Sequence, residues 1–345
     1  MKKVIQIVCV AVVVVSLGSI AVAEVNIETV PVGNPGNAGE LSGASVGGRG
    51  PDRICGAVAY KYNIGKYEVT AGQYCEFLNA VAKTDTYGLY NSGMVESDGC
   101  QITQDGRSGN YTYDFSGRPG GDESDWVDRP VNYVSFWDAA RFANWLHNGQ
   151  PVGPQDLTTT EDGAYTLTAD GISNNTVTRN AGAQWAVTSE DEWYKAAYYS
   201  GSGGTYYDYA TGTDSASSND LVEPTDPGNN ATFYQGDYTI GGPYHRTEFG
   251  AHENSESPYE TFDQGGNVHE WNDTITSSRD RGLRGGSFAY SYHTLLASFG
   301  GGFYPDDEDS TIGFRVSEVP EPATMTMLTL GGLTLVRRRK RRACK

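Results

Sequence analysis

The stretch GGNVHEW, Gly265 to Trp271, places a histidine directly before a glutamate and lies between two further carboxylates, Asp263 and Asp273. Such a grouping suggests either metal binding or acid–base chemistry. A His-Glu pair forms a zinc motif only when a second histidine follows one helical turn later, and here that position is Asp273. We therefore do not expect His269 to be catalytic or to bind a metal, and the meaning of the stretch depends on its surroundings in the chain.

Three blocks upstream of this stretch predict short helices, because each begins with a capping box and continues with apolar residues at helical spacing. The capping pairs are Thr70 with Gln73, Ser135 with Asp138, and Thr188 with Asp191. Rough alternation of apolar and polar residues from Ile54 to Val69 predicts short strands. Long segments rich in Gly, Ser, Asn, Thr and Tyr separate the helices, at 84–128, 149–184 and 200–262. Segments of this length indicate a mostly irregular fold held together by a few elements, buried aromatic residues or bound ions.

Six blocks, taken in order, resemble the sulfatase-modifying-factor domain, which is the fold of the formylglycine-generating enzymes and their nonheme-iron relatives. They are KYNIGKYEVTAGQYCEFLNAV (61–81), RPVNYVSFWDAARFANWL (129–146), WAVTSEDEWYKAAYY (185–199), GGNVHEW (265–271), RGLRGGSF (281–288) and IGFRV (312–316). The resemblance implies an α+β, C-type-lectin-like fold with low regular secondary structure and long loops. Arg284 and Arg315 lie in two of these blocks, and we expect them to order the core by hydrogen bonding.

Both ends of the chain resemble sorting signals. Two lysines precede an apolar run that ends in Ala-Val-Ala at residues 21–23, which predicts a signal peptide at 1–23 that signal peptidase removes. A VPEP motif, an apolar segment and a basic tail make up residues 319–345. Their order resembles the PEP-CTERM sorting signal, which an exosortase recognises and removes in that family.

The apolar segment of this tail, residues 323–336, is short against the roughly 20 residues that a membrane-spanning helix needs. The basic residues after it would hold the C-terminus on the cytoplasmic side. We therefore expect a transient or retained C-terminal membrane anchor, and a mature protein in the periplasm, at the cell surface or in the extracellular matrix. Between the signals we expect a flexible Gly/Pro-rich leader at 24–53 and a sulfatase-modifying-factor domain at 54–318.

The chain is acidic, with 43 Asp and Glu residues against 25 Lys and Arg and a formal charge of −18. Loss of the two ends would remove mainly cations. Such a charge argues against nucleic acid or anionic lipid as a partner and suits an exported protein that binds cations such as calcium. An oxidising compartment permits one disulfide among Cys55, Cys75 and Cys100, and their spacing leaves the pairing open.

The family resemblance also implies a structural calcium site in the loop around GGNVHEW. In the family an Asn or Asp, two backbone carbonyls and a glutamate bind this ion. The corresponding groups here are Asp263, the carbonyls of Gly266 and Val268, and Glu270. Calcium takes about six to eight hard oxygen ligands, with backbone carbonyls commonly among them. The alternative is a plain turn in which a buried Glu270 accepts hydrogen bonds from backbone amides.

Other metal positions of the family are altered. A second calcium site would fall at Asn230 and Ala231, where the spacing departs from the family pattern. In true formylglycine-generating enzymes, two cysteines after RGGS bind copper(I) and activate oxygen. The corresponding residues here are Leu295 and Gly300, which cannot bind copper. The nonheme-iron relatives use a histidine triad from an additional helical domain, which this sequence does not contain. We expect calcium as a cofactor, no copper, and no catalytic residue.

These departures favour a non-catalytic, exported binding module associated with the surface or the extracellular matrix. Tyrosines in the long loops suit contact with a protein or with a glycan such as extracellular polysaccharide, or else they cover the loops' own core. They are Tyr198, Tyr199, Tyr206, Tyr207, Tyr209 and Tyr234. A second hypothesis is a metal-dependent oxidoreductase whose atypical site uses His293 with Tyr290 or Tyr292. A third is a matrix component without a specific ligand.

Overall fold

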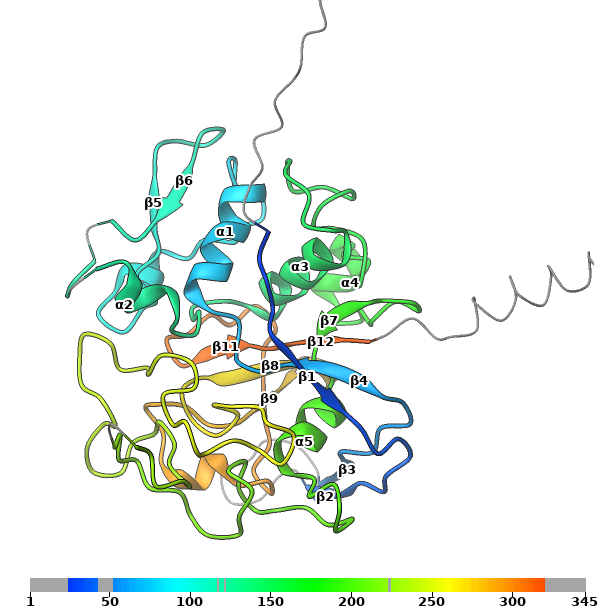
Figure 1. The fold of residues 1–345 in the computed structure, drawn as a ribbon. Coiled ribbons are helices and arrows are strands. Elements are labelled where there is room, and N and C mark those ends of the chain that lie inside the picture. The colour runs from blue at the N-terminus through cyan, green and yellow to red at the C-terminus, as the bar shows by residue number, and fades with distance from the viewer. Residues whose placement is uncertain (1–23, 43–51, 117, 121, 223–224, 320–345) are drawn as a thin grey trace, which may run out of the picture.

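The computed structural model shows how the central part of the chain folds (Figure 1). The described residues are 24–42, 52–116, 118–120, 122–222 and 225–319. The predicted signal peptide at 1–23 and the apolar segment at 323–336 lie outside these ranges. Within them, no helix combines the length and the apolar character that crossing a membrane requires.

Two four-stranded sheets organise the described residues. The first has the order β1-β4-β12-β7 and is antiparallel throughout. Its strands are β1 (Thr29–Val32), β4 (Tyr62–Gly65), β12 (Val316–Glu318) and β7 (Trp185–Val187). The second has the order β10-β9-β8-β11, and only the pairing of β11 with β8 is parallel. Its strands are β10 (Gly301–Phe303), β9 (Arg281–Arg284), β8 (His269–Ile275) and β11 (Ile312–Phe314).

The three predicted helices are present as α1 (Ala71–Val81), α3 (Phe136–His147) and α5 (Glu190–Tyr198). The first two begin with the predicted capping boxes. The third box is one residue later than predicted: Ser189 Oγ accepts from the Glu192 backbone N–H at 3.1 Å, and Glu192 Oε2 accepts from the Ser189 N–H at 2.8 Å. Short elements also interrupt the predicted long segments. They are the helices α2 (Ser124–Val127), α4 (Ala169–Ser173) and η1 (Ser92–Val95), and the strands β5 (Thr103–Asp105) and β6 (Thr112–Asp114). A further short helix, η2 (Tyr292–Leu295), lies between β9 and β10.

The described part of 200–262 has neither helix nor strand and pairs only through isolated bridges, which confirms the prediction for this segment. The prediction for 24–53 differs from the structure. Strand β1 pairs with β4, and β2 (Glu40–Ser42) pairs with β3 (Arg53–Cys55). Val30 and Val32 alternate inward and are buried in one apolar cluster. The described residues of this segment, 24–42 and 52–53, are therefore part of the folded domain, because the valines of β1 have the period of a strand despite the surrounding glycines and prolines.

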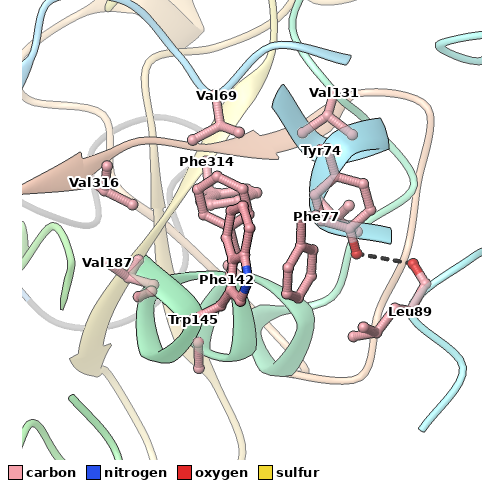
Figure 2. Packing of buried hydrophobic residues seen from close by; sticks show 14 of the residues in the cluster. Val69, Tyr74, Phe77, Leu89, Val131, Phe142, Trp145, Val187, Phe314 and Val316 are labelled. Atoms are coloured by element: carbon pink, nitrogen blue, oxygen red, sulfur yellow. Dashed lines mark hydrogen bonds between the residues drawn. The ribbon is translucent and has the colours of Figure 1, made fainter. Parts of the chain in front are cut away.

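The main core lies where α1 and α3 pack beside the strands β11 and β12 (Figure 2). Phe142 of α3 meets Phe77 of α1 and Phe314 of β11 with ring centroids 5.3 Å apart in each pair, edge to face. Tyr74 joins the same group, and its hydroxyl donates to the Leu89 carbonyl at 2.8 Å. The aromatic rings thus couple both helices to the second sheet, and the buried phenol of Tyr74 has a hydrogen-bond partner.

We expect Phe142→Ala to lower the free energy of unfolding by about 3–5 kcal/mol, because the ring is fully buried and its removal leaves a cavity between three elements. Urea unfolding followed by tryptophan fluorescence would measure the loss. Leu157→Ala is the control, since Leu157 is 70% exposed. Similar losses for the two variants would contradict the assignment of the core.

Candidate functional site

Glu270 of β8 lies at the centre of the predicted calcium loop and is fully buried. Arg315 grips its carboxylate with two hydrogen bonds, from Nε to Oε2 at 3.0 Å and from Nη2 to Oε1 at 2.9 Å. The indole Nε1–H of Trp193 donates to Oε2 at 2.7 Å. Both carboxylate oxygens therefore already accept from side chains, rather than from the backbone amides that the alternative of a plain turn would use.

Two more carboxylates lie near the same guanidinium. Asp263 has a backbone φ of +61° and accepts from the Gly250 N–H at 2.8 Å. Burial raises the pKa of Asp263 to about 6, and the charge of Glu270 adds to the rise. Glu68 is buried, lies 4.0 Å from Arg315, and has no hydrogen-bond partner among the described residues. Burial and the charge of Asp263 raise the pKa of Glu68 well above its ordinary value.

The carboxylates of Glu68, Asp263 and Glu270 thus face a single guanidinium in the described structure, and their excess negative charge calls for protons or a cation. Within the described ranges, no three His, Cys, Asp or Glu side chains are arranged to hold a metal ion. A calcium ion in this loop would depend mainly on Asp263 and on backbone carbonyls. The fit to calcium is therefore partial.

The two loops predicted to bind calcium meet at one small polar cavity. Asn230 and Asp263 both line it, beside Ser255 and Gln264. Its volume is ≈ 10 Å³, about enough for one water molecule or ion. The amide of Asn230 donates to Asp226, so only the carbonyl oxygen of its side chain is left to act as a ligand. The Ala231 carbonyl, the other predicted ligand, accepts from Thr239 Oγ1 at 3.4 Å.

Gly266 closes the loop by backbone contact. Its φ is +96°, and a Cβ at this position would lie 2.3 Å from the carbonyl oxygen of Thr232. The Asn267 N–H donates to the same carbonyl at 2.8 Å. Val268 is fully buried beside it. Only glycine permits this approach, so the GGN sequence is explained by packing of the loop, whether or not an ion is bound.

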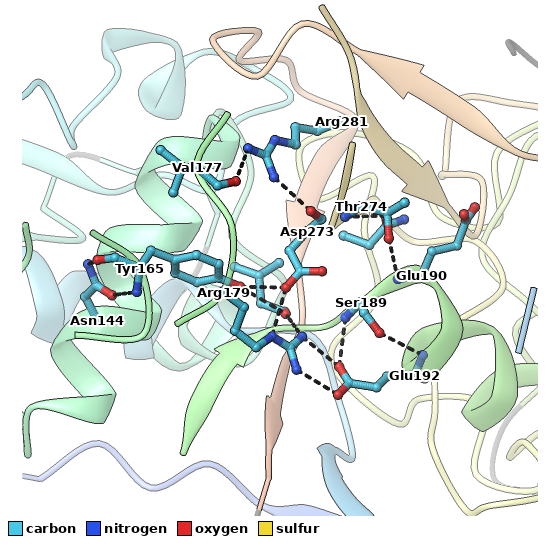
Figure 3. Close-up of polar contacts among 12 residues, drawn as sticks. Asn144, Tyr165, Val177, Arg179, Ser189, Glu190, Glu192, Asp273, Thr274 and Arg281 are labelled. Carbon is cyan, nitrogen blue, oxygen red and sulfur yellow. Dashed lines mark hydrogen bonds and ion pairs between the residues drawn. The ribbon is translucent and has the colours of Figure 1, made fainter. Parts of the chain in front are cut away.

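Asp273 belongs to a different group of charges (Figure 3). Arg179 donates to Asp273 at 2.9 Å and to both carboxylate oxygens of Glu192 at 2.8 Å. The Tyr165 hydroxyl also donates to Asp273, at 3.0 Å. Burial raises the pKa of Glu192, but the charge and hydrogen bonds of Arg179 outweigh it and hold the pKa at about 2. This network joins α5 to β8 and leaves the calcium loop without Asp273.

The chain neighbours of Leu295 and Gly300, the expected counterparts of the family's copper thiols, line an apolar pocket of ≈ 160 Å³. Leu295 is buried with Tyr209, Ala231 and Phe233. The residues that line the pocket are His269, Leu283, Tyr290, Thr294, Phe299, Gly301 and Phe303. Burial lowers the pKa of His269 to about 4, so its imidazole is neutral. His293 is exposed and does not line this pocket, and its ring packs on Tyr292 with centroids 4.0 Å apart.

The thiols of Cys55, Cys75 and Cys100 are all free and buried. Cys75 and Cys100 belong to the core of α1 and α3, whereas Cys55 lies in a separate cluster with Ala297. Arg284 Nη2 donates to Cys55 Sγ at 3.3 Å. Burial, assisted by Glu190, raises the pKa of Cys55 to about 12, so this thiol is protonated and unreactive.

The loop tyrosines mostly face inward. Tyr198, Tyr199 and Tyr209 are buried, Tyr206 and Tyr207 are half-buried, and Tyr234 is 38% exposed. The interpretation that they present a ligand surface is therefore wrong for the three buried ones, which pack within the domain.

Sequence reasoning missed a larger acidic cavity of ≈ 520 Å³. Tyr87, Trp137, Asp138 and Glu308 line it from three segments that are far apart in the chain. The only local sign of this cavity in the sequence is the tryptophan at the start of α3. The phenylalanine before it packs in the core, and the tryptophan lines the cavity.

The family model described as the sulfatase-modifying factor enzyme 1-like domain matches residues 39–319, and the PEP-CTERM protein-sorting motif matches residues 318–342. A comparison with curated protein sequences found no match.

Similar solved structures are the crystal structure of CarF, variable protein 1 of Treponema denticola, and PvdO from Pseudomonas aeruginosa. CarF is 20% identical, with a TM-score of 0.45 over 86% of this chain and 99% of that chain. The Treponema protein is 17% identical, with a TM-score of 0.47 over 87% and 98%. PvdO is 17% identical, with a TM-score of 0.46 over 85% and 94%.

We expect Glu192→Gln to lower the free energy of unfolding by about 3 kcal/mol at pH 7, because it removes one of the two carboxylates that hold the buried Arg179 guanidinium. The pKa of Glu192 is about 2 in the folded protein against 4.5 ordinarily. Its contribution is therefore complete above about pH 4.5 and disappears as the pH falls towards 2. Urea unfolding from pH 5 to pH 2 should show a shallower loss for the variant, with exposed Glu253→Gln as the control. Equal slopes would contradict this assignment.

Proposed function

Because the chain belongs to the sulfatase-modifying factor enzyme 1-like domain family, with its α+β, C-type-lectin-like fold, we propose that it is a binding module without the copper chemistry of that family. The PEP-CTERM motif at 318–342 implies export, processing by an exosortase and association with the cell envelope. We propose in addition that signal peptidase removes residues 1–23, and that 323–336 serves as a transient or retained anchor. The mature protein would then act in the periplasm, at the cell surface or in the extracellular matrix.

The main support for this proposal is that the residues at the two copper positions have no group that binds copper. Copper(I) requires soft thiolate ligands, and Leu295 and Gly300 supply none. Leu295 is 1% exposed inside an apolar cluster, so this position contributes to the core. Cys55, the thiol that shares a cluster with Ala297, is held protonated. A protonated lone thiol would not replace a pair of thiolates.

A binding role is supported by the irregular surface that the fold presents. The described part of 200–262 is built from turns and bridges, and such loops commonly carry recognition residues on a rigid scaffold. The acidic cavity of ≈ 520 Å³ lies within the size range of small-ligand sites. A glycan or a protein is the ligand class that we propose, and nucleic acid is disfavoured by the charge of −18.

Metal analysis and oxygen uptake test the loss of copper chemistry. We expect the full chain, purified without chelator, to contain only trace copper and iron, and to consume no oxygen with a cysteine-containing peptide. Incubation with copper(I) before the assay should change neither result, because no thiolate pair is available. Stoichiometric copper or iron together with oxygen uptake would overturn the proposal and favour an oxidoreductase with an atypical site.

We also propose a structural calcium ion at the loop of Asp263, with the carbonyls of Gly266 and Val268. Glu270 would contribute chiefly its charge, because Arg315 and Trp193 already occupy its oxygens. The excess charge of Glu68 and Asp263 supports the proposal, since a divalent cation would neutralise it. The carbonyl oxygen of the Asn230 side chain and the backbone of Ala231 would complete the shared cavity.

The calcium proposal predicts near-stoichiometric calcium and a fall in melting temperature of about 5–10 °C on chelation with EDTA. Asp263→Asn should abolish both effects and destabilise the protein, whereas Asp220→Asn, on an exposed loop, should leave both unchanged. Without a bound cation, the same Asp263→Asn substitution would be neutral or stabilising above pH 6, because it removes a buried like charge. That opposite sign would contradict the proposal.

A further inference from the structure

Three segments and a short helix enclose the acidic cavity, which has a volume of ≈ 520 Å³. Tyr87 and Gly88 come from the loop after α1, and Asp306 with Glu308 comes from the loop after β10. The first turns of α3 provide a third side, and α4 adds the apolar side chain of Ile172. The first two of these segments contain no residue of the calcium loop, of the copper positions or of the family blocks.

A pair of carboxyl groups lies at the base of the cavity. Asp138 is 2% exposed, and its Oδ2 accepts from the Ser135 N–H at 2.9 Å and from the Ser135 hydroxyl at 2.6 Å. Glu308 is hydrogen-bonded to Asp138 and accepts from the side-chain amide of Asn91. Burial raises the pKa of both carboxyl groups. The base therefore offers several hydrogen-bond acceptors close together.

The aromatic residues of the cavity add apolar wall and an exposed ring. Trp137 is 3% exposed, and its indole Nε1–H is closed off from solvent, so this residue supplies apolar wall to the cavity rather than a donor. Tyr87 remains 46% exposed although the Arg141 guanidinium lies 4.4 Å from its ring centroid. The Arg141 guanidinium therefore holds the Tyr87 ring in place, while the rest of the ring remains accessible to a ligand.

The charges exclude anionic ligands. Arg141 is bound to both carboxylate oxygens of Glu161, at 2.7 and 3.1 Å, so it does not neutralise the cavity. Asp138, Asp306 and Glu308 leave the cavity negative overall. Carboxyl groups beside apolar and aromatic walls suit a ligand that has hydroxyl groups at its edge and C–H groups on its face. A sugar ring without acidic groups has both.

We propose that this cavity binds an uncharged or amino-substituted sugar residue, with Tyr87 against the ring face and the Asp138–Glu308 pair on its hydroxyl groups. The inference rests on the binding function proposed above and names its ligand class and its site. Uronic acids and phosphorylated sugars would be rejected, because their charge would meet unscreened carboxylates in a partly buried cavity.

Calorimetric titration of the full chain with four probes tests the proposal. They are cellotetraose, chitotetraose, glucosamine and trigalacturonate, and we expect saturable binding of at least one of the first three and none of the last. Tyr87→Ala and Glu308→Gln should each weaken that binding by about tenfold or more, since both remove direct contacts at the site. Thermal melting of each variant would show that it is folded.

Tyr304→Ala is the matched control. Tyr304 is 48% exposed and carries the Arg279 guanidinium 5.1 Å from its ring centroid, which nearly reproduces the setting of Tyr87 on neighbouring surface. We expect it to change binding less than twofold, about the scatter of near-neutral surface substitutions. Sugar binding that survives both Tyr87→Ala and Glu308→Gln would place the site elsewhere and leave the binding function standing. Binding of no probe, or preference for trigalacturonate, would overturn the sugar site, whereas oxygen uptake with stoichiometric copper would overturn the binding function itself.

Discussion

The buried guanidinium of Arg315 is the interaction on which the two sheets depend. Arg315 lies between β11 and β12, where the chain passes from the second sheet into the first. It holds Glu270 of β8, the Gly65 carbonyl at the end of β4 and the Phe262 carbonyl of the long loop, the latter two at 2.8 Å. One planar group thus fixes both sheets and the loop, which lysine with its single ammonium could not do.

Other buried arginines extend the same principle to a domain that is poor in regular structure. Loop carbonyls need donors once they leave water, and here side chains provide them in place of strand or helix neighbours. Arg284 donates to the carbonyls of Ala297 and Phe299, Arg281 to those of Asp273 and Val177, and Arg246 to those of Asp98 and Gly99. The long irregular segments are therefore ordered by a few cations, although the chain as a whole is strongly acidic.

The sequence predicted what is local and missed what depends on distant partners. Capping boxes and helical spacing located three helices, and the core role expected for Arg284 and Arg315 is confirmed. The third cap was displaced because Glu192, held by Arg179, pairs with Ser189 rather than with the preceding threonine. The calcium hypothesis could not anticipate that Glu270 would be bound by an arginine 45 residues later. The acidic cavity was invisible for the same reason, since its walls come from separate segments.

The proposed loss of copper chemistry is compatible with an intact fold. Leu295 replaces a polar metal ligand by an apolar side chain that packs in its own cluster, and burial of such a side chain is worth about 1.5–3 kcal/mol. Arg284 and Glu270 lie on strands β9 and β8, Arg315 lies between β11 and β12, and neither Leu295 nor Gly300 takes part in their ion pairs. Substitutions in the loops can therefore change which ligand is bound, while the buried ion pairs hold the strands in place. The cavity beside Trp137 is built on that scaffold from residues that the framework does not use.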